Sequence, residues 1–218
     1  MLRNVPEMSN EPVNIAKRLS SERMSSYLVA SSGNLSKALE LYKWNIALSG
    51  ALFEAIAIVE VVVRNEIDNN LHSWAKPFGK DWMDIVPVDD KATTDIARAR
   101  SRNTRDLSHG KVLAELNFGF WRYLVAIRYL HTIWIPIMND AFPNLKGHPG
   151  ERREKVERAI ERLWFLRNRI GHHEPIFSRN VNRDMTAITS LLDWICVDTS
   201  AWASAQRRVQ NVVLLRPI

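Results

Sequence analysis

Apolar residues recur every three or four positions along most of the chain, and no segment shows the strict alternation of a half-buried strand. This spacing predicts helices over residues 12–30, 35–74, 89–102, 111–117, 121–130, 151–170, 182–197 and 200–213. Glycine, proline and polar clusters predict loops at 31–34, 76–87 and 143–150, and a kink at 118–120. The pattern indicates an all-α protein, with residues 1–33 as an N-terminal helical appendage and 34–218 as a single helical domain.

The apolar face of the helix predicted over 151–170 contains an arginine. Arg167 falls in the middle of a stripe formed by Val156, Ala159, Ile160, Leu163, Leu166 and Ile170. Arginine is almost never fully buried unless it is paired, because an unpaired buried charge is very costly. We therefore expect this side chain to meet an acid, a cavity or a partner chain.

The long helix predicted over 35–74 shows the same kind of anomaly. Glu60 and Arg64 lie on a face that also carries Phe53, Ala57, Ile67 and Leu71. The two charged residues are four positions apart, in the orientation that favours a helical ion pair. Two interpretations stay open, namely an internal ion-pair network between helices, or a polar pocket between two helices or two subunits.

The residues that follow Arg167 add chemistry to that position. Gly171 is expected as the first residue past the helix, so that His172 and His173 can fold back toward Arg167. A histidine can exchange a proton near neutral pH, and an arginine can stabilise charge on a phosphorane-like transition state. With Asn168 to orient either group, the set is sufficient for metal-independent RNA cleavage by attack of the ribose 2′-OH.

Two other interpretations apply to the histidine pair. Adjacent histidines rarely point at one metal ion, and the lone Cys196 offers no cysteine-based site, so we expect no metal and no cofactor. Alternatively, a protonated histidine at the end of the helix only complements the helix dipole.

The distribution of charged residues indicates a second candidate surface. The chain of 218 residues carries a net charge of +6, with hydrophobic and charged shares that exclude wholesale disorder. Its basic residues are mostly arginine, which favours a nucleic acid partner, although a solvated surface gives the same composition. Four arginines crowd one segment and are candidates for RNA binding or for a solvated face: Arg98, Arg100, Arg102 and Arg105.

Two further clusters have simpler explanations. Arginines and glutamates alternate over residues 151–162, which favours a solvated face with salt bridges. The aromatic cluster at 118–123 is more typical of core packing than of base stacking.

Nothing in the sequence suggests a membrane or secreted protein. No stretch of 18 uninterrupted apolar residues occurs, because Glu54 and Glu60 interrupt the most apolar segment. Residues 1–10 contain no apolar core of a signal peptide, and a single cysteine suits a reducing compartment. We expect a cytoplasmic protein without a membrane partner.

The motif at the end of the 151–170 helix resembles a known signature. Arg167, Asn168 and His172 fit the Arg-polar-x3–5-His pattern of the HEPN superfamily of ribonucleases. Four stretches resemble the Abi-like branch, named for bacterial abortive-infection proteins: ALELYKWN at 38–45, EVVVRN at 60–65, LNFGFW at 116–121 and LRNRIGHHEPIF at 166–177. The resemblance covers nearly the whole chain after about residue 30.

The resemblance implies an all-α, HEPN-like helical bundle with additional helices, acting as a homodimer in which two motifs meet in a cleft. It implies metal-independent endoribonuclease activity on RNA in phage defence or a toxin–antitoxin system, the latter adding an antitoxin protein as a candidate partner. By the same resemblance, Arg167 and His172 are catalytic and Asn168 supports them. Glu60 and Arg64 are expected to line the same pocket.

Two alternatives stay open at this point. His173 also satisfies the spacing of the motif, so either histidine is a candidate for the acting group. A protein that keeps the fold but only binds RNA or a partner would retain the same sequence blocks.

Overall fold

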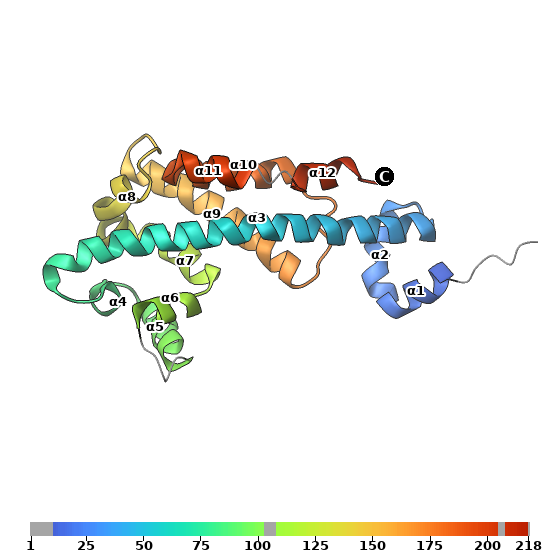
Figure 1. Ribbon diagram of the computed structural model, residues 1–218. Coiled ribbons are helices and arrows are strands. Elements are labelled where there is room, and N and C mark those ends of the chain that lie inside the picture. Colours follow the sequence, from blue (N-terminus) through green and yellow to red (C-terminus); the bar gives the residue numbers. More distant parts are fainter. Residues whose placement is uncertain (1–10, 103–107, 205–207, 218) are drawn as a thin grey trace, which may run out of the picture. The chain divides into compact units, whose positions relative to one another are not determined.

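The computed structural model describes residues 11–102, 108–204 and 208–217 (Figure 1). These residues form helices and turns without any strand, which confirms the all-α prediction. The α-helices are α1 (Glu11–Leu19), α2 (Ser21–Ala30), α3 (Leu35–Ala75), α4 (Trp82–Ile85), α5 (Asp90–Arg102), α6 (His109–Glu115), α7 (Phe118–Leu124), α8 (Ile135–Ala141), α9 (Pro149–Gly171), α10 (Val181–Ile195), α11 (Val197–Ser204) and α12 (Arg208–Leu214).

The chain divides into two compact units. The described residues within 1–53, 169–179 and 207–218 form one, which we call the terminal unit. Those within 54–168 and 180–206 form the other, the central unit. The terminal unit contains α1, α2, α12 and the turn after α9, and the central unit contains α4 to α8, α10, α11 and most of α9. Both α3 and α9 contribute residues to each unit.

The helix α3 confirms the long helix predicted from the sequence, but its buried face differs. Phe53 is 45% exposed and Ala57 is exposed, so the prediction that they line an apolar face is wrong. Relative to the predicted face, the buried face is rotated by about one residue around the helix axis. It carries Leu41, Leu48, Leu52, Ile56, Val59, Val63, Ile67 and Leu71. These positions recur every three to four residues, and the larger aliphatic side chains among them determine which face packs.

The same helix bears on the question of a membrane. Among the described residues, the segment Leu35–Phe78 is long and apolar enough to cross a membrane by length and composition alone. The core helix of a soluble protein passes the same test, and a third of the most apolar part is buried in the protein. The finding is weak in either direction, and a cytoplasmic location stays a prediction.

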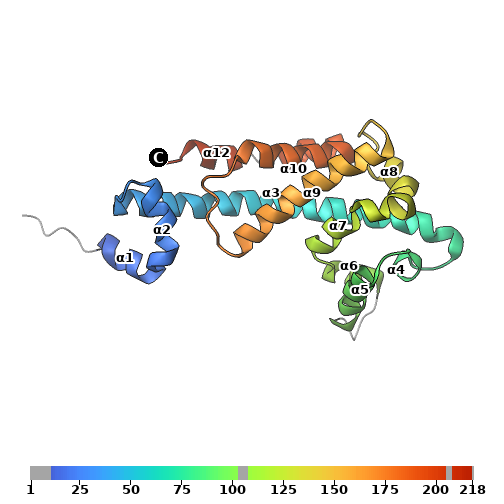
Figure 2. The ribbon, with the colours of Figure 1, turned by 180° about the vertical axis from the view of Figure 1, so that it is seen from behind.

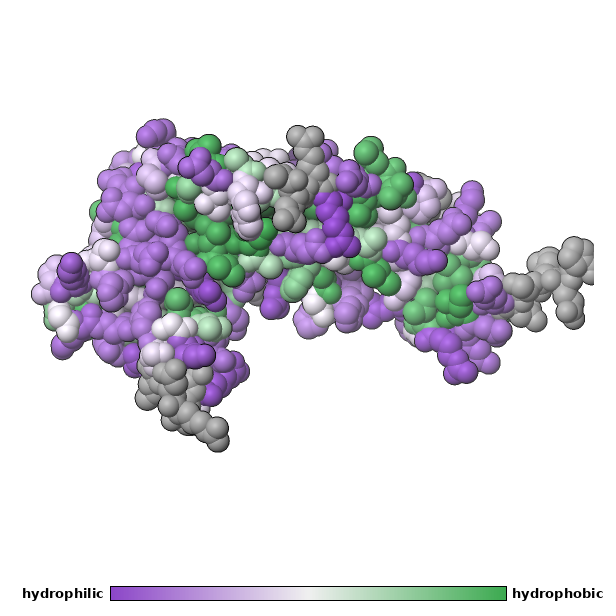
Figure 3. Space-filling view, in the orientation of Figure 1, coloured by the Kyte–Doolittle hydropathy of each residue, from purple (hydrophilic) through white to green (hydrophobic). Residues whose placement is uncertain are grey.

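In the terminal unit, the single helix predicted over 12–30 is wrong, because Ser20 interrupts it. Ser20 has a φ of 74°, and its hydroxyl accepts a hydrogen bond from the Arg23 amide at 3.3 Å, which caps the start of α2. Helix α2 buries Met24 and Tyr27, whereas α1 buries no residue. Figure 3 shows an apolar patch over α1 and α2, whose exposed apolar residues include Val13, Ile15 and Val29.

In the central unit, aromatic side chains fill the core. Trp82 is fully buried and its indole N–H donates to Asp68 Oδ1 at 2.7 Å, so residues 82–85 form α4 rather than the predicted loop. Phe118, Phe120 and Trp121 are also buried, which confirms core packing. Within this unit, α10 and α11 lie above α3 and α4 to α6 lie below it, in both views (Figures 1 and 2).

The segment after α6 also differs from prediction. The Asn117 side chain accepts a hydrogen bond from the Phe120 amide at 3.1 Å, so α7 begins at Phe118 without the predicted kink. The helix ends at Leu124, and a 3-10 turn (Ile127–Tyr129) and a π turn (Leu130–Trp134) replace the rest of the predicted helix. Near the C-terminus, α11 and α12 account for the described residues of the helix predicted over 200–213, and residues 205–207 between them lie outside the described part.

The first turns of α9 depart in part from the predicted solvated, salt-bridged face: Glu154 and Arg158 are exposed and paired, but two arginines are buried. Arg152 and Arg153 are only 6% and 4% exposed. One guanidinium nitrogen of Arg152 donates to the carbonyls of Met138 and Phe142, at 2.8 and 2.7 Å. Arg153 donates to the Val125 carbonyl at 2.7 Å. The two arginines thus add donors to carbonyls at or near the ends of α7 and α8.

Candidate functional site

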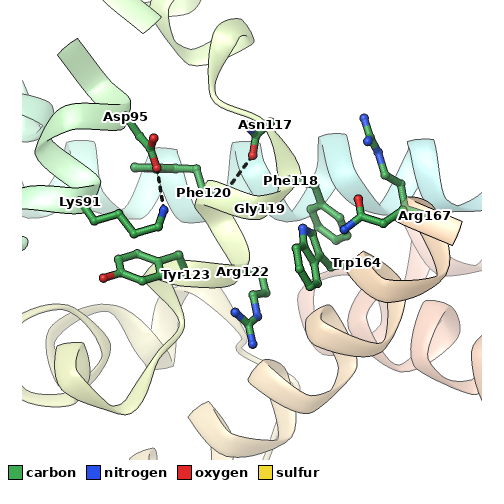
Figure 4. Close-up of a pocket in the computed structure, with 11 residues that line it drawn as sticks. Lys91, Asp95, Asn117, Phe118, Gly119, Phe120, Arg122, Tyr123, Trp164 and Arg167 are labelled. Atoms are coloured by element: carbon green, nitrogen blue, oxygen red, sulfur yellow. Dashed lines mark hydrogen bonds and ion pairs between the residues drawn. The ribbon is translucent and has the colours of Figure 1, made fainter. Parts of the chain in front are cut away.

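A cleft of about 710 Å³ opens in the central unit between α5, α7 and α9 (Figure 4). Its lining combines basic, aromatic and amide side chains with one acid: Lys91, Asp95, Asn117, Phe118, Gly119, Phe120, Arg122, Tyr123, Trp164, Arg167 and Asn168. The volume lies within the range of small-molecule sites. Two of the residues singled out from the sequence, Arg167 and Asn168, therefore line one cleft.

Arg167 lines the cleft from a position next to the buried face of α9. Leu163 and Leu166 are fully buried, and Arg167, the next residue, is partly exposed. Its Nε atom is buried without a hydrogen-bond partner among the described residues. The guanidinium groups of Arg122 and Arg167 extend in opposite directions on either side of Trp164 (Figure 4).

Glu60 of α3 is the acid that interacts with Arg167. Burial raises the pKa of the Glu60 carboxyl, and the charges of Arg167 and Arg64 and the backbone N–H of Phe118 lower it only in part. The net effect is a pKa above the ordinary value, so burial outweighs the two arginines. Glu60 is thus coupled electrostatically to Arg64 and Arg167, but neither Glu60 nor Arg64 is among the residues that line the cleft.

Gly119 allows α7 and α9 to approach at the cleft. A Cβ atom at this position would lie 2.9 Å from Asn117 Oδ1 and 3.2 Å from Trp164 Nε1. The guanidinium carbon of Arg122 lies 5.1 Å from the Trp164 ring centre, and Arg122 also forms an ion pair with Glu161. The close approach fixes the indole at the cleft wall.

A second cation–aromatic cluster borders the cleft at Tyr123. Lys91 Nζ and the Arg128 guanidinium lie 4.3 and 4.6 Å from its ring centre. The Tyr123 hydroxyl donates to Asp89 at 2.5 Å, and Arg128 donates to the same carboxylate at 3.0 Å. Desolvation raises the pKa of Asp89, but these and other hydrogen bonds outweigh it and lower the pKa to about 2. The Asp89 carboxylate therefore stays ionised over the physiological range.

The two histidines of the motif belong to the terminal unit, and the cleft lining ends at Asn168. Gly171 is the last residue of α9, so the prediction that it follows the helix is wrong. His173 takes the left-handed position instead, with a φ of 56°. The side chains of His172 and His173 are exposed.

The arginines predicted to bind RNA on α5 are exposed but paired with acids. Arg98 contacts Asp95 at 3.2 Å. Arg100 contacts Asp84 at 2.6 Å, and Arg102 contacts Glu115 at 3.5 Å. Arg105 lies outside the described residues. These ion pairs reduce the net positive charge that α5 offers to a phosphate backbone.

Sequence reasoning missed one charged constellation in the central unit. His109 Nδ1 lies 2.6 Å from Asp81 Oδ2, and Nε2 lies 2.8 Å from Asp68 Oδ1. Desolvation lowers the pKa of His109, but the two carboxylates raise it more, and the net pKa is above the ordinary value. The three residues are far apart in the sequence and form no motif, so no sequence signal could have identified them.

Within residues 11–102, 108–204 and 208–217, no group of three or more His, Cys, Asp or Glu residues could hold a metal ion. The lining of the cleft is mainly basic and aromatic. Comparisons of the chain with protein families, with curated proteins and with solved structures found no match.

Proposed function

We propose that this protein is a metal-independent endoribonuclease of the HEPN type, similar to the Abi-like branch. In this proposal it acts as a cytoplasmic homodimer in phage defence or in a toxin–antitoxin system. The single observation that carries the proposal is that Arg167 and Asn168, two residues of the Arg-polar-x3–5-His motif, line a cleft large enough for a nucleotide.

The roles follow from the chemistry of each group. Arg167 stabilises the negative charge on the phosphorane-like transition state, and Asn168 orients the phosphate or the ribose. His172, or His173 in its place, exchanges the proton of the 2′-OH or of the leaving 5′-oxygen. The 2′-oxygen forms a bond to phosphorus while the bond to the 5′-oxygen breaks, which leaves a 2′,3′-cyclic phosphate.

The surroundings of Arg167 support a site that holds an anion. Its Nε atom has no hydrogen-bond partner among the described residues, and its acidic neighbour Glu60 has a raised pKa. The other cations of the lining, Lys91 and Arg122, are already paired with Asp95 and Glu161. A phosphate would therefore gain most from Arg167.

A second candidate is a protein that binds RNA or a partner without cleaving it. One observation favours this alternative, because the electrostatic coupling of Arg167 to Glu60 also suits a structural ion pair. A wild-type protein that binds RNA but does not cleave it would favour this alternative.

The decisive experiment incubates purified protein with total RNA in EDTA, beside Arg167→Ala. We expect cleavage by the wild type, products with 2′,3′-cyclic phosphate or 3′-phosphate ends, and no cleavage by the variant. Cleavage that EDTA abolishes and Mg²⁺ or Mn²⁺ restores would contradict the metal-independent mechanism. Light scattering tests the homodimer, and a fully active monomer at micromolar concentration would contradict that part of the proposal.

A further inference from the structure

The turn that carries His172 and His173 has a defined backbone. The His173 amide donates to the Ile170 carbonyl at 3.0 Å, and the Glu174 amide donates to the Arg169 carbonyl at 2.8 Å. This pair of bonds is the Schellman pattern, in which the left-handed residue is usually glycine. Here the residue is His173, whose Cβ makes that conformation costly. Such a conformation persists only where neighbouring contacts impose it.

Helix α2 supplies one of these contacts from far away in the sequence. The Arg23 guanidinium donates to the His173 carbonyl, so it holds the backbone of the left-handed residue directly. One turn further along α2, Tyr27 is fully buried, and its ring centre lies 5.1 Å from that of Phe177. Helix α2 therefore touches the segment at two places, at the turn itself and after it.

Further bonds fix the chain as it leaves the turn. The Ile176 amide donates to Asn45 Oδ1 of α3 at 2.8 Å, in a buried position. Arg169 donates to the Pro175 carbonyl at 2.8 Å and lies 3.5 Å from the Glu174 carboxylate. The backbone of the turn is thus held from α2, α3 and α9, all by residues of the terminal unit.

The side chains of the two histidines remain exposed while the backbone beneath them is fixed. A proton-exchanging group needs solvent or substrate access and also a defined position. We propose that Arg23 is a positioning residue for the His172–His173 turn. Helix α2, within the segment predicted as an N-terminal appendage, is then part of the apparatus that presents these histidines. This inference rests on the proposed function for its catalytic consequence, but not for its structural claim.

The test compares Arg23→Ala with Arg18→Ala, a matched change at an exposed arginine of α1. The structural readout is hydrogen exchange of the Glu174 amide in the full-length protein. We expect Arg23→Ala to accelerate this exchange roughly tenfold, the effect of losing one charged hydrogen bond. Arg18→Ala should leave it unchanged. Unchanged exchange in Arg23→Ala overturns the proposal.

The catalytic readout is RNA cleavage resolved into kcat and KM. Arg23→Ala should lower kcat about ten- to a hundredfold with KM unchanged, because the histidines lose their position and not the affinity for RNA. Arg23→Lys should recover part of kcat. An unchanged kcat in an active enzyme overturns the positioning role. If the wild type cleaves no RNA, the proposed function fails, and the exchange measurement still decides whether Arg23 holds the turn.

A rescue variant guards against a general loss of folding. Glycine adopts the left-handed conformation without strain. Arg23→Ala/His173→Gly should therefore return Glu174 exchange to near the wild-type rate. Exchange that stays fast in the double variant would show that the contact at His173 is not what orders the turn, and would overturn the proposal. If Arg23→Ala does not fold, Arg23→Gln takes its place in the same comparison.

Discussion

Within the central unit, the start and the end of its α9 segment place arginines in opposite surroundings. Arg152 and Arg153 are buried and bound to backbone carbonyls. Arg167 is partly exposed, lines the cleft, and has Glu60 as its electrostatic neighbour. All three arginines lie on a single helix, yet only the last has surroundings that leave room for a ligand.

The difference shows how a buried arginine and a site arginine can be told apart. Burial lowers the pKa of Arg152, but its donors meet fixed carbonyl oxygens, so its charge is used to hold α8 against α9. The Nε atoms of Arg152 and Arg167 are both buried without a hydrogen-bond partner among the described residues, but Arg167 is partly exposed and lines the cleft. The first arrangement stabilises the fold, and the second is suited to an incoming anion.

The largest expected effect is the loss of RNA cleavage in the Arg167→Ala variant. Removing the group that stabilises the transition-state charge should lower kcat about 10²–10³-fold. Melting should change much less than in a variant at Arg152. Gel-based cleavage assays on total RNA and thermal melts of the same preparations measure both effects.

Arg158→Ala is the matched control for this variant. Arg158 is exposed on the same helix and forms a surface ion pair with Glu154, so neither activity nor melting should change. Equal loss of activity in both variants would mean that α9 arginines act through general charge, and that Arg167 has no special role.

The second effect concerns stability at the other end of the helix. Arg152→Ala removes a buried charged donor from the Met138 and Phe142 carbonyls, each of which then keeps only a backbone N–H donor. We expect a loss of about 2–4 kcal/mol in the free energy of unfolding. Urea denaturation measures it, and a loss below that of Arg158→Ala would refute the structural assignment.

The third prediction concerns His109, whose contribution to the stability of the fold depends on pH. Both ring nitrogens of His109 face carboxylates, which only accept hydrogen bonds, so both contacts require the protonated ring. The raised pKa of His109 means that its stabilisation is fully present below about pH 6.5 and is lost as the pH rises through the folded-state value.

His109→Ala should therefore cost roughly 1 kcal/mol at pH 6, with the partial exposure of the ring taken into account. The difference from wild type should shrink as the pH rises above about 6.5 and through the raised folded-state pKa. Melting curves across that range provide the measurement. A difference that grows with pH would have the wrong sign for this assignment.

Helical period alone predicts several features of the fold and of the cleft. The bounds of α3, α5 and α10 agree with prediction to within one or two residues, and the charged residues that interrupt apolar faces, Glu60 and Arg167, are coupled in the structure. The period of α9 identifies Arg167 as a charge that interrupts an apolar stripe, whereas Glu60 lies on a predicted face of α3 that is partly exposed.

Features that depend on backbone conformation or distant partners could not be predicted. Nothing in the sequence marks Ser20 or His173 for a positive φ, since residues other than glycine seldom adopt it. The acceptors of Arg152 are backbone carbonyls, and every residue has one, so the pattern of charged residues cannot identify them. A mixed arginine–glutamate segment therefore predicts a solvated face, although part of it is buried.

The smallest expected effect sharpens the comparison at the cleft itself, through Glu60→Gln. A raised carboxyl pKa means that the folded state binds more protons than the unfolded state, so ionised Glu60 destabilises the fold as the pH rises above about 4.5. Glutamine keeps an oxygen for the Phe118 amide and removes the charge. The variant should gain up to about 1 kcal/mol at pH 7, and the gain should vanish toward pH 4. Melting of both proteins over pH 4–8 measures it. A loss of several kcal/mol at pH 7 would instead identify Glu60 and Arg167 as a structural ion pair, like the buried arginines at the start of α9, and would favour the non-catalytic alternative.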